Sequence, residues 1–143
     1  MSAPAHQPDP LEQRPLPILS GSNRPYWEAA TLGRIDLPCC NACGKVFYPI
    51  GPVCPACFSA DLGWRTVTGR GTVSSFVVYR QAFFAFWKDK LPYTVVQVEL
   101  DEGPRVNGNL LECDPERVRI GMRVVATFEK VDDQITLPHF KPE

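Results

Sequence analysis

Residues 40–57 read CNACGKVFYPIGPVCPAC and carry two cysteine pairs, each with two residues between its cysteines. A turn this tight brings both thiolates onto one metal ion, and two such turns supply the four sulfur ligands of tetrahedral zinc. Gly44 follows the first pair, where a backbone without a Cβ lets amide groups point at sulfur. The spacing therefore predicts one zinc ion bound by Cys40, Cys43, Cys54 and Cys57.

A redox role is the main alternative for a cysteine pair of this spacing. Redox pairs occur singly at the start of a helix in a thioredoxin-like context, whereas this chain has two pairs ten residues apart. A disulfide framework needs an oxidising compartment, and residues 1–10 are polar and proline-rich, unlike a signal peptide. Because protein sulfurs fill all four positions, the zinc is expected to be structural. Cys39 is expected to lie outside the site.

The composition describes a globular chain with balanced charge. Its 143 residues include 15 Lys and Arg and 16 Asp and Glu, which gives a formal net charge of −1. No run of like charge accumulates, and this argues against electrostatic binding of nucleic acid. No apolar stretch approaches the ~18 residues that span a bilayer. A cytoplasmic protein is therefore expected.

Four segments are expected along the chain. They are a flexible arm at 1–22, an N-terminal helix at 23–37, a zinc ribbon at 38–65 and an OB-fold domain at 66–143. Five prolines mark the arm as extended, and the helix has Asn23 as its expected cap and Gly33 as its stop. Within the ribbon, Val46, Phe47 and Tyr48 are typical of a hairpin between the two ligand pairs.

Apolar residues alternate with polar ones from Thr66 onward, which is the pattern of half-buried strands. Val96, Val98 and Leu100, for example, share one face of a strand. Strands are expected at 71–79, 93–100, 105–111, 122–128 and 134–137. Five strands in so short a module predict a mainly β fold with a small OB-type barrel, and an SH3-like barrel is the alternative.

The sequence offers no catalytic constellation. Its only two histidines, His6 and His139, are poor candidates for a base beside a serine or cysteine nucleophile. Cys113 stands alone and is expected to be an ordinary buried thiol. Catalytic residues are therefore not expected in this chain.

Residues 81–92, QAFFAFWKDKLP, form the most unusual connection between strands. They hold four large aromatic residues, followed by two lysines, and a small barrel cannot house all four rings. The rings are expected to cover a groove, to bind an apolar ligand or to dock on another protein. The alternative is a short helix that packs on the mouth of the barrel.

Read in order, these features resemble a known family. Residues 25–57 read PYWEAATLGRIDLPCCNACGKVFYPIGPVCPAC, and GRGTVSSFVVYR, LPYTVVQVELDEGPRVNGNLL and IGMRVVATFE follow in the barrel. The order resembles the acyl-CoA-associated zinc-ribbon and OB-fold family, formerly a domain of unknown function, over about residues 24–140. The resemblance implies an N-terminal helix, a rubredoxin-like zinc ribbon and a five-stranded OB-type barrel.

The resemblance also implies an accessory role, because family members generally work as small partners of thiolase-superfamily enzymes that carry the catalytic residues. It implies a hetero-oligomer with a thiolase-like subunit and an acyl-CoA at or near the shared interface, with no nucleic acid and no membrane as partner. The aromatic connection favours a degradative thiolase acting on a bulky or aromatic β-ketoacyl-CoA. A subunit of a steroid side-chain aldolase or acyltransferase and a nucleic-acid-binding module are the alternatives.

The residues expected to contact CoA or the partner lie in and beside the aromatic connection. The rings are expected to meet the partner or the acyl chain, and the basic side chains the phosphates of CoA. They are Arg80, Phe83, Phe84, Phe86, Trp87, Lys88 and Lys90.

Overall fold

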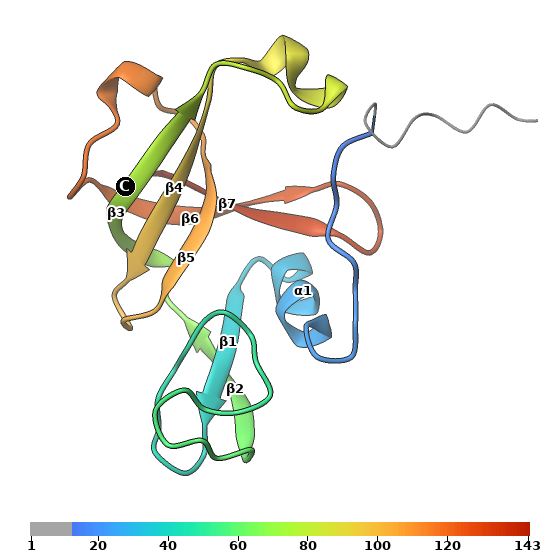
Figure 1. Ribbon diagram of the computed structural model, residues 1–143, viewed down its shortest axis with the longest axis vertical. Coiled ribbons are helices and arrows are strands. Elements are labelled where there is room, and N and C mark those ends of the chain that lie inside the picture. Colours follow the sequence, from blue (N-terminus) through green and yellow to red (C-terminus); the bar gives the residue numbers. More distant parts are fainter. Residues whose placement is uncertain (1–12) are drawn as a thin grey trace, which may run out of the picture.

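Two β modules follow one another in the computed structural model, which describes residues 13–143 (Figure 1). The first module holds helix α1 (Arg24–Thr31) and strands β1 (Ile35–Cys40) and β2 (Leu62–Val67). The second is a closed barrel of β3 (Arg70–Tyr79), β4 (Tyr93–Leu100), β5 (Arg105–Leu110), β6 (Arg123–Lys130) and β7 (Thr136–Pro142). Two short 3-10 helices, η1 (Ala85–Lys90) and η2 (Pro115–Arg117), lie in its connections. The expected mainly β fold with one α-helix and a five-stranded barrel is confirmed.

Helix α1 is shorter than the range 23–37 that the sequence suggested. It has a proline in its first turn and ends at Thr31. Gly33 takes a φ of +74°, a conformation that costs glycine little, and its N–H donates to the carbonyl of Ala30 at 3.0 Å. Because this left-handed residue stops the helix, the chain is free to begin strand β1 at Ile35.

The expected side-chain cap of α1 is wrong. Asn23 occupies the cap position, but its side chain makes no bond to the helix. Its Oδ1 accepts from the backbone N–H of Ser20 at 2.8 Å, and its Nδ2 donates to the carbonyl of Ile18 at 3.0 Å. Asn23 therefore fixes the preceding turn instead of the first helical N–H groups.

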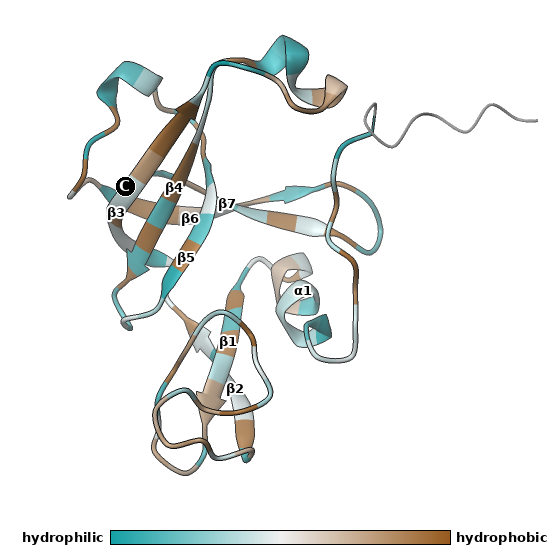
Figure 2. Cartoon of the chain, in the orientation of Figure 1, coloured by the Kyte–Doolittle hydropathy of each residue, from teal (hydrophilic) through white to brown (hydrophobic). Residues whose placement is uncertain are grey.

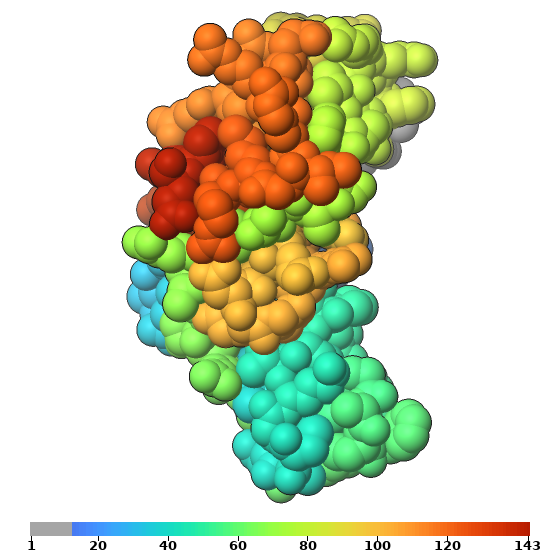
Figure 3. Space-filling view, turned by 90° about the vertical axis from the view of Figure 1, so that its left-hand side faces the viewer, coloured from blue at the N-terminus to red at the C-terminus, as the bar shows by residue number. Residues whose placement is uncertain are grey.

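The ribbon is built by β1 and β2, which pair antiparallel from Ile35 opposite Val67 to Cys40 opposite Leu62. The hairpin expected between the two cysteine pairs is wrong, since Val46 makes only an isolated bridge to Cys39. Prolines at 49 and 52 have no N–H to extend a ladder there. The strand that completes the ribbon comes after the second cysteine pair. Figure 3 shows the ribbon at one end of the molecule and the barrel at the other.

The barrel runs in the order β3-β4-β5-β7-β6 and is antiparallel except at one seam. Between β5 and β7 there is a single parallel bridge, Leu110 opposite Phe140. Strand β7 pairs with β6 along its length, although Pro138 and Pro142 lie within it. Proline is tolerated where one edge of a strand is largely unpaired. The strand predicted at 134–137 stopped before Pro138 and is therefore shorter than β7.

Alternating residues of the strands fill the barrel. Val96, Val98 and Leu100 are fully buried, as their spacing predicted, and Phe140 from β7 joins them. In Figure 2, β3 is brown toward its connection to β4, whereas polar residues in teal interrupt the brown of β4. Thr94 has the same parity as these residues and is also buried, so one polar side chain occupies a core-facing position.

The segment from residue 13 to α1 runs beside the β6–β7 hairpin (Figure 1). Arg14 anchors it there through a bidentate ion pair with Glu129, 115 residues away in sequence. The rest of the expected flexible arm, residues 1–12, lies outside the described residues. Within residues 13–143, no helix has the length and apolar character needed to cross a membrane.

Candidate metal centre and candidate contact site

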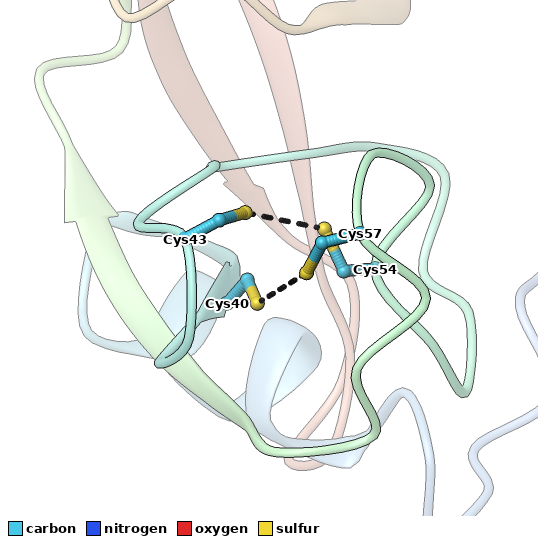
Figure 4. A group of neighbouring side chains, drawn as sticks. All are labelled: Cys40, Cys43, Cys54 and Cys57. Atoms are coloured by element: carbon cyan, nitrogen blue, oxygen red, sulfur yellow. Dashed lines mark hydrogen bonds between the residues drawn. The ribbon is translucent and has the colours of Figure 1, made fainter.

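Four cysteine sulfurs converge between the two loops of the ribbon (Figure 4). The Sγ atoms of Cys40 and Cys57 lie 3.6 Å apart, as do those of Cys43 and Cys54, and all four lie within 4.8 Å of one another. A zinc ion with Zn–S bonds of about 2.3 Å holds its sulfurs about 3.8 Å apart in a tetrahedron. The four side chains are therefore positioned to bind one metal ion, and the expected zinc ligand set fits.

The two cysteine turns share one backbone geometry. The N–H of Gly44 donates to the carbonyl of Cys40 at 2.8 Å, and the N–H of Phe58 donates to that of Cys54 at 2.9 Å. Both donors have positive φ, +78° for Gly44 and +61° for Phe58. A bulky residue rarely adopts this conformation. In the second turn Phe58 nevertheless has the left-handed backbone that glycine has in the first turn.

Backbone amides around the cluster favour thiolates, the form of cysteine that binds metal, although hydrogen bonds from neighbouring cysteines outweigh them at Cys43 and Cys57 and raise those two pKa values. The N–H of Cys43 lowers the pKa of Cys40. Burial opposes ionisation of Cys54, but the N–H groups of Cys57 and Ala56 outweigh it and lower the pKa of Cys54 to about 7. With four sulfur ligands there is no open position for water or substrate, so the ion has a structural role.

The other two cysteines lie away from the cluster. The Sγ of Cys39 is 3.7 Å from the carbonyl oxygen of Gly44, and Cys39 is not among the converging residues. Cys113 lies in the barrel module, 3.5 Å from the carbonyl oxygen of Asp114. Neither adds a ligand to the metal site.

The aromatic connection contains η1, which corresponds to the short helix considered as the alternative. Phe86 and Trp87 pack edge to face at 5.1 Å, and Trp87 lies over Tyr93 of β4 at 4.4 Å between ring centroids. The ammonium of Lys90 lies 3.9 Å from the centre of the Phe86 ring. In contrast, Phe83 is 64% exposed. Of the four rings, Phe83 is exposed, and Phe84, Phe86 and Trp87 are half-buried.

The seven residues expected at a CoA or partner site do not form one cluster. Phe86, Trp87 and Lys90 line a cavity. Arg80 instead pairs with Glu116 at 3.1 Å on the surface, and Lys88 is exposed. Phe84 is half-buried. Their roles in contacting CoA or a partner stay predictions.

The cavity has a volume of about 330 Å³ and includes four residues that the sequence did not single out as a site: Arg14, Thr94, Glu129 and His139. Thr94 carried a signal, because it is polar at a core-facing position of a strand. The others carried none, since a pair 115 residues apart has no local pattern. The two Nη atoms of Arg14 lie 2.7 and 3.1 Å from the Glu129 carboxylate.

Arg14→Gln should raise the pKa of Glu129. The Arg14 guanidinium, with a smaller contribution from His139, holds that pKa below the usual value for glutamate of about 4.3. A lowered folded-state pKa adds stability above pH ~4.3 that is lost as the pH falls through the lower value. NMR titration of the Glu129 carboxyl carbon measures the shift. Arg80→Gln, which removes a surface ion pair, is the control and should leave this titration unchanged; an unaltered curve for Arg14→Gln would contradict the assignment.

Comparison with known proteins matches both modules in sequence. Residues 27–63 match the family model described as "ChsH2, rubredoxin-like zinc ribbon domain", and residues 64–129 match "ChsH2, C-terminal OB-fold domain". The two matches meet between Gly63 and Trp64, within β2. The chain thus carries both domains in the order that the sequence resemblance implied.

Two relatives are similar in sequence over much of the chain. A probable enoyl-CoA hydratase alpha subunit from Thermomonospora curvata is 39% identical over 136 residues, which are 93% of this chain and 41% of that protein. A DUF35 domain-containing scaffold protein from Methanothermobacter thermautotrophicus is 38% identical over 96 residues, 66% of this chain and 71% of that protein. The chain therefore spans about two fifths of the hydratase subunit and most of the scaffold protein.

A solved structure supports the same grouping. A chain of the "Ltp2-ChsH2(DUF35) aldolase" superposes with a TM-score of 0.81 at 35% identity, over 89% of this chain and 98% of that one. A DUF35 protein of unknown function from Sulfolobus solfataricus, at 12% identity and a TM-score of 0.59, shares the fold. With its zinc ribbon, its OB-type barrel and these relatives, the chain belongs to the ChsH2-type DUF35 family.

Proposed function

We propose that this chain is a non-catalytic accessory subunit of a thiolase-type enzyme complex and helps to form or stabilise an acyl-CoA site. The observation that carries the proposal is the likeness to the chain of the Ltp2-ChsH2(DUF35) aldolase, which is matched over 98% of its length. A relative described as a scaffold protein and another described as a hydratase alpha subunit support a role within an assembly. The sequence of this chain contributes no catalytic constellation.

Among the reactions considered, the relatives favour an aldolase over degradative thiolysis. One is named an aldolase component, and another, from Mycobacterium tuberculosis, is a 3-oxo-4,17-pregnadiene-20-carboxyl-CoA hydratase alpha subunit that is 31% identical over 128 residues. That subunit is matched over 40% of its own length, so the similarity concerns one part of it. We therefore propose a bulky acyl-CoA as the substrate of the complex and carbon–carbon bond cleavage by the partner as its reaction.

The β3–β4 hairpin offers the surface for docking. Phe76 and Val77 on β3 and Phe83 in the connection to β4 are 37%, 46% and 64% exposed. Phe76 and Val77 are consecutive on β3 and therefore point to opposite faces of the sheet. Phe83 is the most exposed of the three and is the candidate aromatic anchor for a protein interface. Arg80 belongs to the same segment and can supply a cation to an anionic group.

Phe83→Asp should weaken binding to the catalytic subunit about tenfold or more, because a charge at a desolvated aromatic anchor costs at least ~1.4 kcal/mol. Titration calorimetry with a thiolase-like protein from the same organism measures the affinity. Phe58→Asp is a matched control, since Phe58 is 76% exposed on the ribbon and aspartate tolerates its positive φ. Equal affinities for the two variants would contradict docking through the hairpin.

The function itself is tested by co-expression with that thiolase-like protein, followed by sizing and a CoA-thioester cleavage assay. The pair is expected to elute as one complex and to be active, while this chain alone is inactive. Activity of this chain alone would overturn the accessory role. Salt-dependent binding of single-stranded DNA, with no complex, would instead support the nucleic-acid-binding alternative.

A further inference from the structure

Two buried polar side chains line the cavity between the barrel and the N-terminal segment. Thr94 and His139 both line it and are only 3% and 5% exposed. Among residues 13–143, the Thr94 hydroxyl and His139 Nδ1 are the buried side-chain atoms that lack a hydrogen-bond partner. Leaving such an atom unpaired costs about 1–3 kcal/mol. A polar ligand group that reached both atoms from this cavity would satisfy them.

The neighbours of His139 indicate whether its unpaired Nδ1 donates or accepts a hydrogen bond. Its Nε2 lies 3.3 Å from Oε2 of Glu129, whose carboxylate is held in the charged form by Arg14. A carboxylate only accepts hydrogen bonds, so Nε2 carries a proton, and in the tautomer with that single proton Nδ1 is an acceptor. The Thr94 hydroxyl can donate or accept. A ligand hydroxyl suits the pair, because it can donate to His139 and accept from Thr94.

The rest of the cavity wall is aromatic and electrically balanced. Phe86, Trp87 and Tyr93 contribute rings. The charged lining residues are two cations, Arg14 and Lys90, and two anions, Glu112 and Glu129, which sum to zero. A neutral, flat and mainly apolar body therefore fits these walls better than an ion does.

The volume of the cavity indicates the size of the ligand part that it can enclose. A cavity of about 150 Å³ holds one benzene ring, and this cavity of about 330 Å³ has roughly twice that space. One or two rings can therefore enter. A long acyl chain or a nucleotide would extend out of the cavity into solvent.

We propose that this cavity binds a neutral compound of one or two rings that carries a hydroxyl group, a phenol or an alicyclic alcohol. Arg14 positions Glu129, Glu129 fixes the tautomer of His139, and His139 and Thr94 bind the hydroxyl. Every wall of the cavity belongs to this chain, so binding does not depend on the proposed catalytic partner.

The test compares two probes of equal shape on the zinc-loaded 143-residue chain. p-Cresol carries the hydroxyl, and p-xylene has a methyl group in its place. Saturable shifts in NMR spectra at Thr94 and His139 are expected with p-cresol, and about tenfold weaker binding with p-xylene, which loses the hydrogen bonds. Equal affinity for the two probes, or no saturable binding of p-cresol, would overturn the proposal.

Variants at the two polar residues locate the hydroxyl. Thr94→Val keeps the shape but removes the hydroxyl and should weaken p-cresol binding about tenfold, whereas Thr94→Ser retains the hydroxyl and should bind within about threefold of the original chain. His139→Gln keeps a polar group toward Glu129, removes the Nδ1 acceptor and should bind as weakly as Thr94→Val. Circular dichroism verifies that each variant is folded.

Unchanged p-cresol affinity in folded Thr94→Val or His139→Gln would refute the assignment. Such a failure would leave assembly with the catalytic subunit unaffected, because Phe83 lies outside the cavity lining. The outcome for the cavity is therefore separate from the outcome for the proposed function.

Discussion

Cys54→Ser is expected to release the metal ion and unfold the ribbon. The Cys54 side chain is fully buried, and a serine hydroxyl is a poor replacement for a thiolate ligand. The ribbon has little apolar core of its own beyond Cys40, Phe47 and Cys54. In small zinc modules the metal contributes about 10–16 kcal/mol of apparent binding free energy at pH 7, which is also folding free energy. Elemental analysis measures the zinc, and NMR shows which module loses its dispersed signals.

Cys39→Ser provides a matched control for this experiment. Cys39 precedes the ligand Cys40 directly but lies outside the sulfur cluster, so its replacement should leave one zinc per chain and the ribbon folded. The barrel strands of Cys54→Ser should keep their signals, because most of their core lies outside the cluster of Cys40, Phe47 and Cys54. Shifts are expected where Ile35, Leu37 and Val67 of the ribbon strands pack into the barrel core. A Cys54→Ser protein that retained stoichiometric zinc and a folded ribbon would contradict a structural role of the metal.

Phe140→Ala should lower the free energy of unfolding of the barrel by about 3–5 kcal/mol, the usual cost of truncating a buried phenylalanine. The ring is 1% exposed and packs against β5 so closely that a Cβ on Gly108 would lie 3.0 Å from its Cδ2. Phe140 also forms the single bridge between β5 and β7. The variant therefore creates a cavity where the barrel has its fewest backbone hydrogen bonds. Urea denaturation followed by circular dichroism measures the change.

Phe58→Ala removes the same side chain from an exposed position and serves as the comparison. Phe58 is 76% exposed, and surface substitutions usually change the free energy of unfolding by less than ~0.5 kcal/mol. If Phe140→Ala cost less than about 1 kcal/mol, the central place of Phe140 in the core would be wrong.

Local patterns in the sequence were sufficient to predict much of this structure. The spacing of the cysteines predicted the metal ligands because a two-residue turn restricts where the second sulfur can lie. Alternation predicted β4 at 93–100 with its observed bounds, and glycine at 33 predicted the end of α1. Each of these features depends on neighbouring residues in the chain. A short stretch of sequence is therefore enough to predict them.

Features that depend on distant residues escaped prediction. The Asn23 side chain is a local exception, because it could bond either to the helix or to the preceding turn, and it bonds to Ser20 and Ile18. The partner strand of β1 lies beyond the second cysteine pair, where the pattern around Leu62 gave no strong strand signal. The Arg14–Glu129 pair joins opposite ends of the chain, so no local sequence pattern predicts it. Such contacts follow from the completed fold.

The single bridge between β5 and β7 determines where the barrel is expected to open locally. Amide protons exchange with solvent through local openings, and segments with few hydrogen bonds open at the lowest free energy. Strands β5 and β7 should accordingly separate at Leu110 and Phe140 before any other strand pair, and without global unfolding. Leu110 lies in the wall of the cavity that holds Thr94 and His139. Opening of this junction would therefore widen the cavity while the remaining strands stay paired.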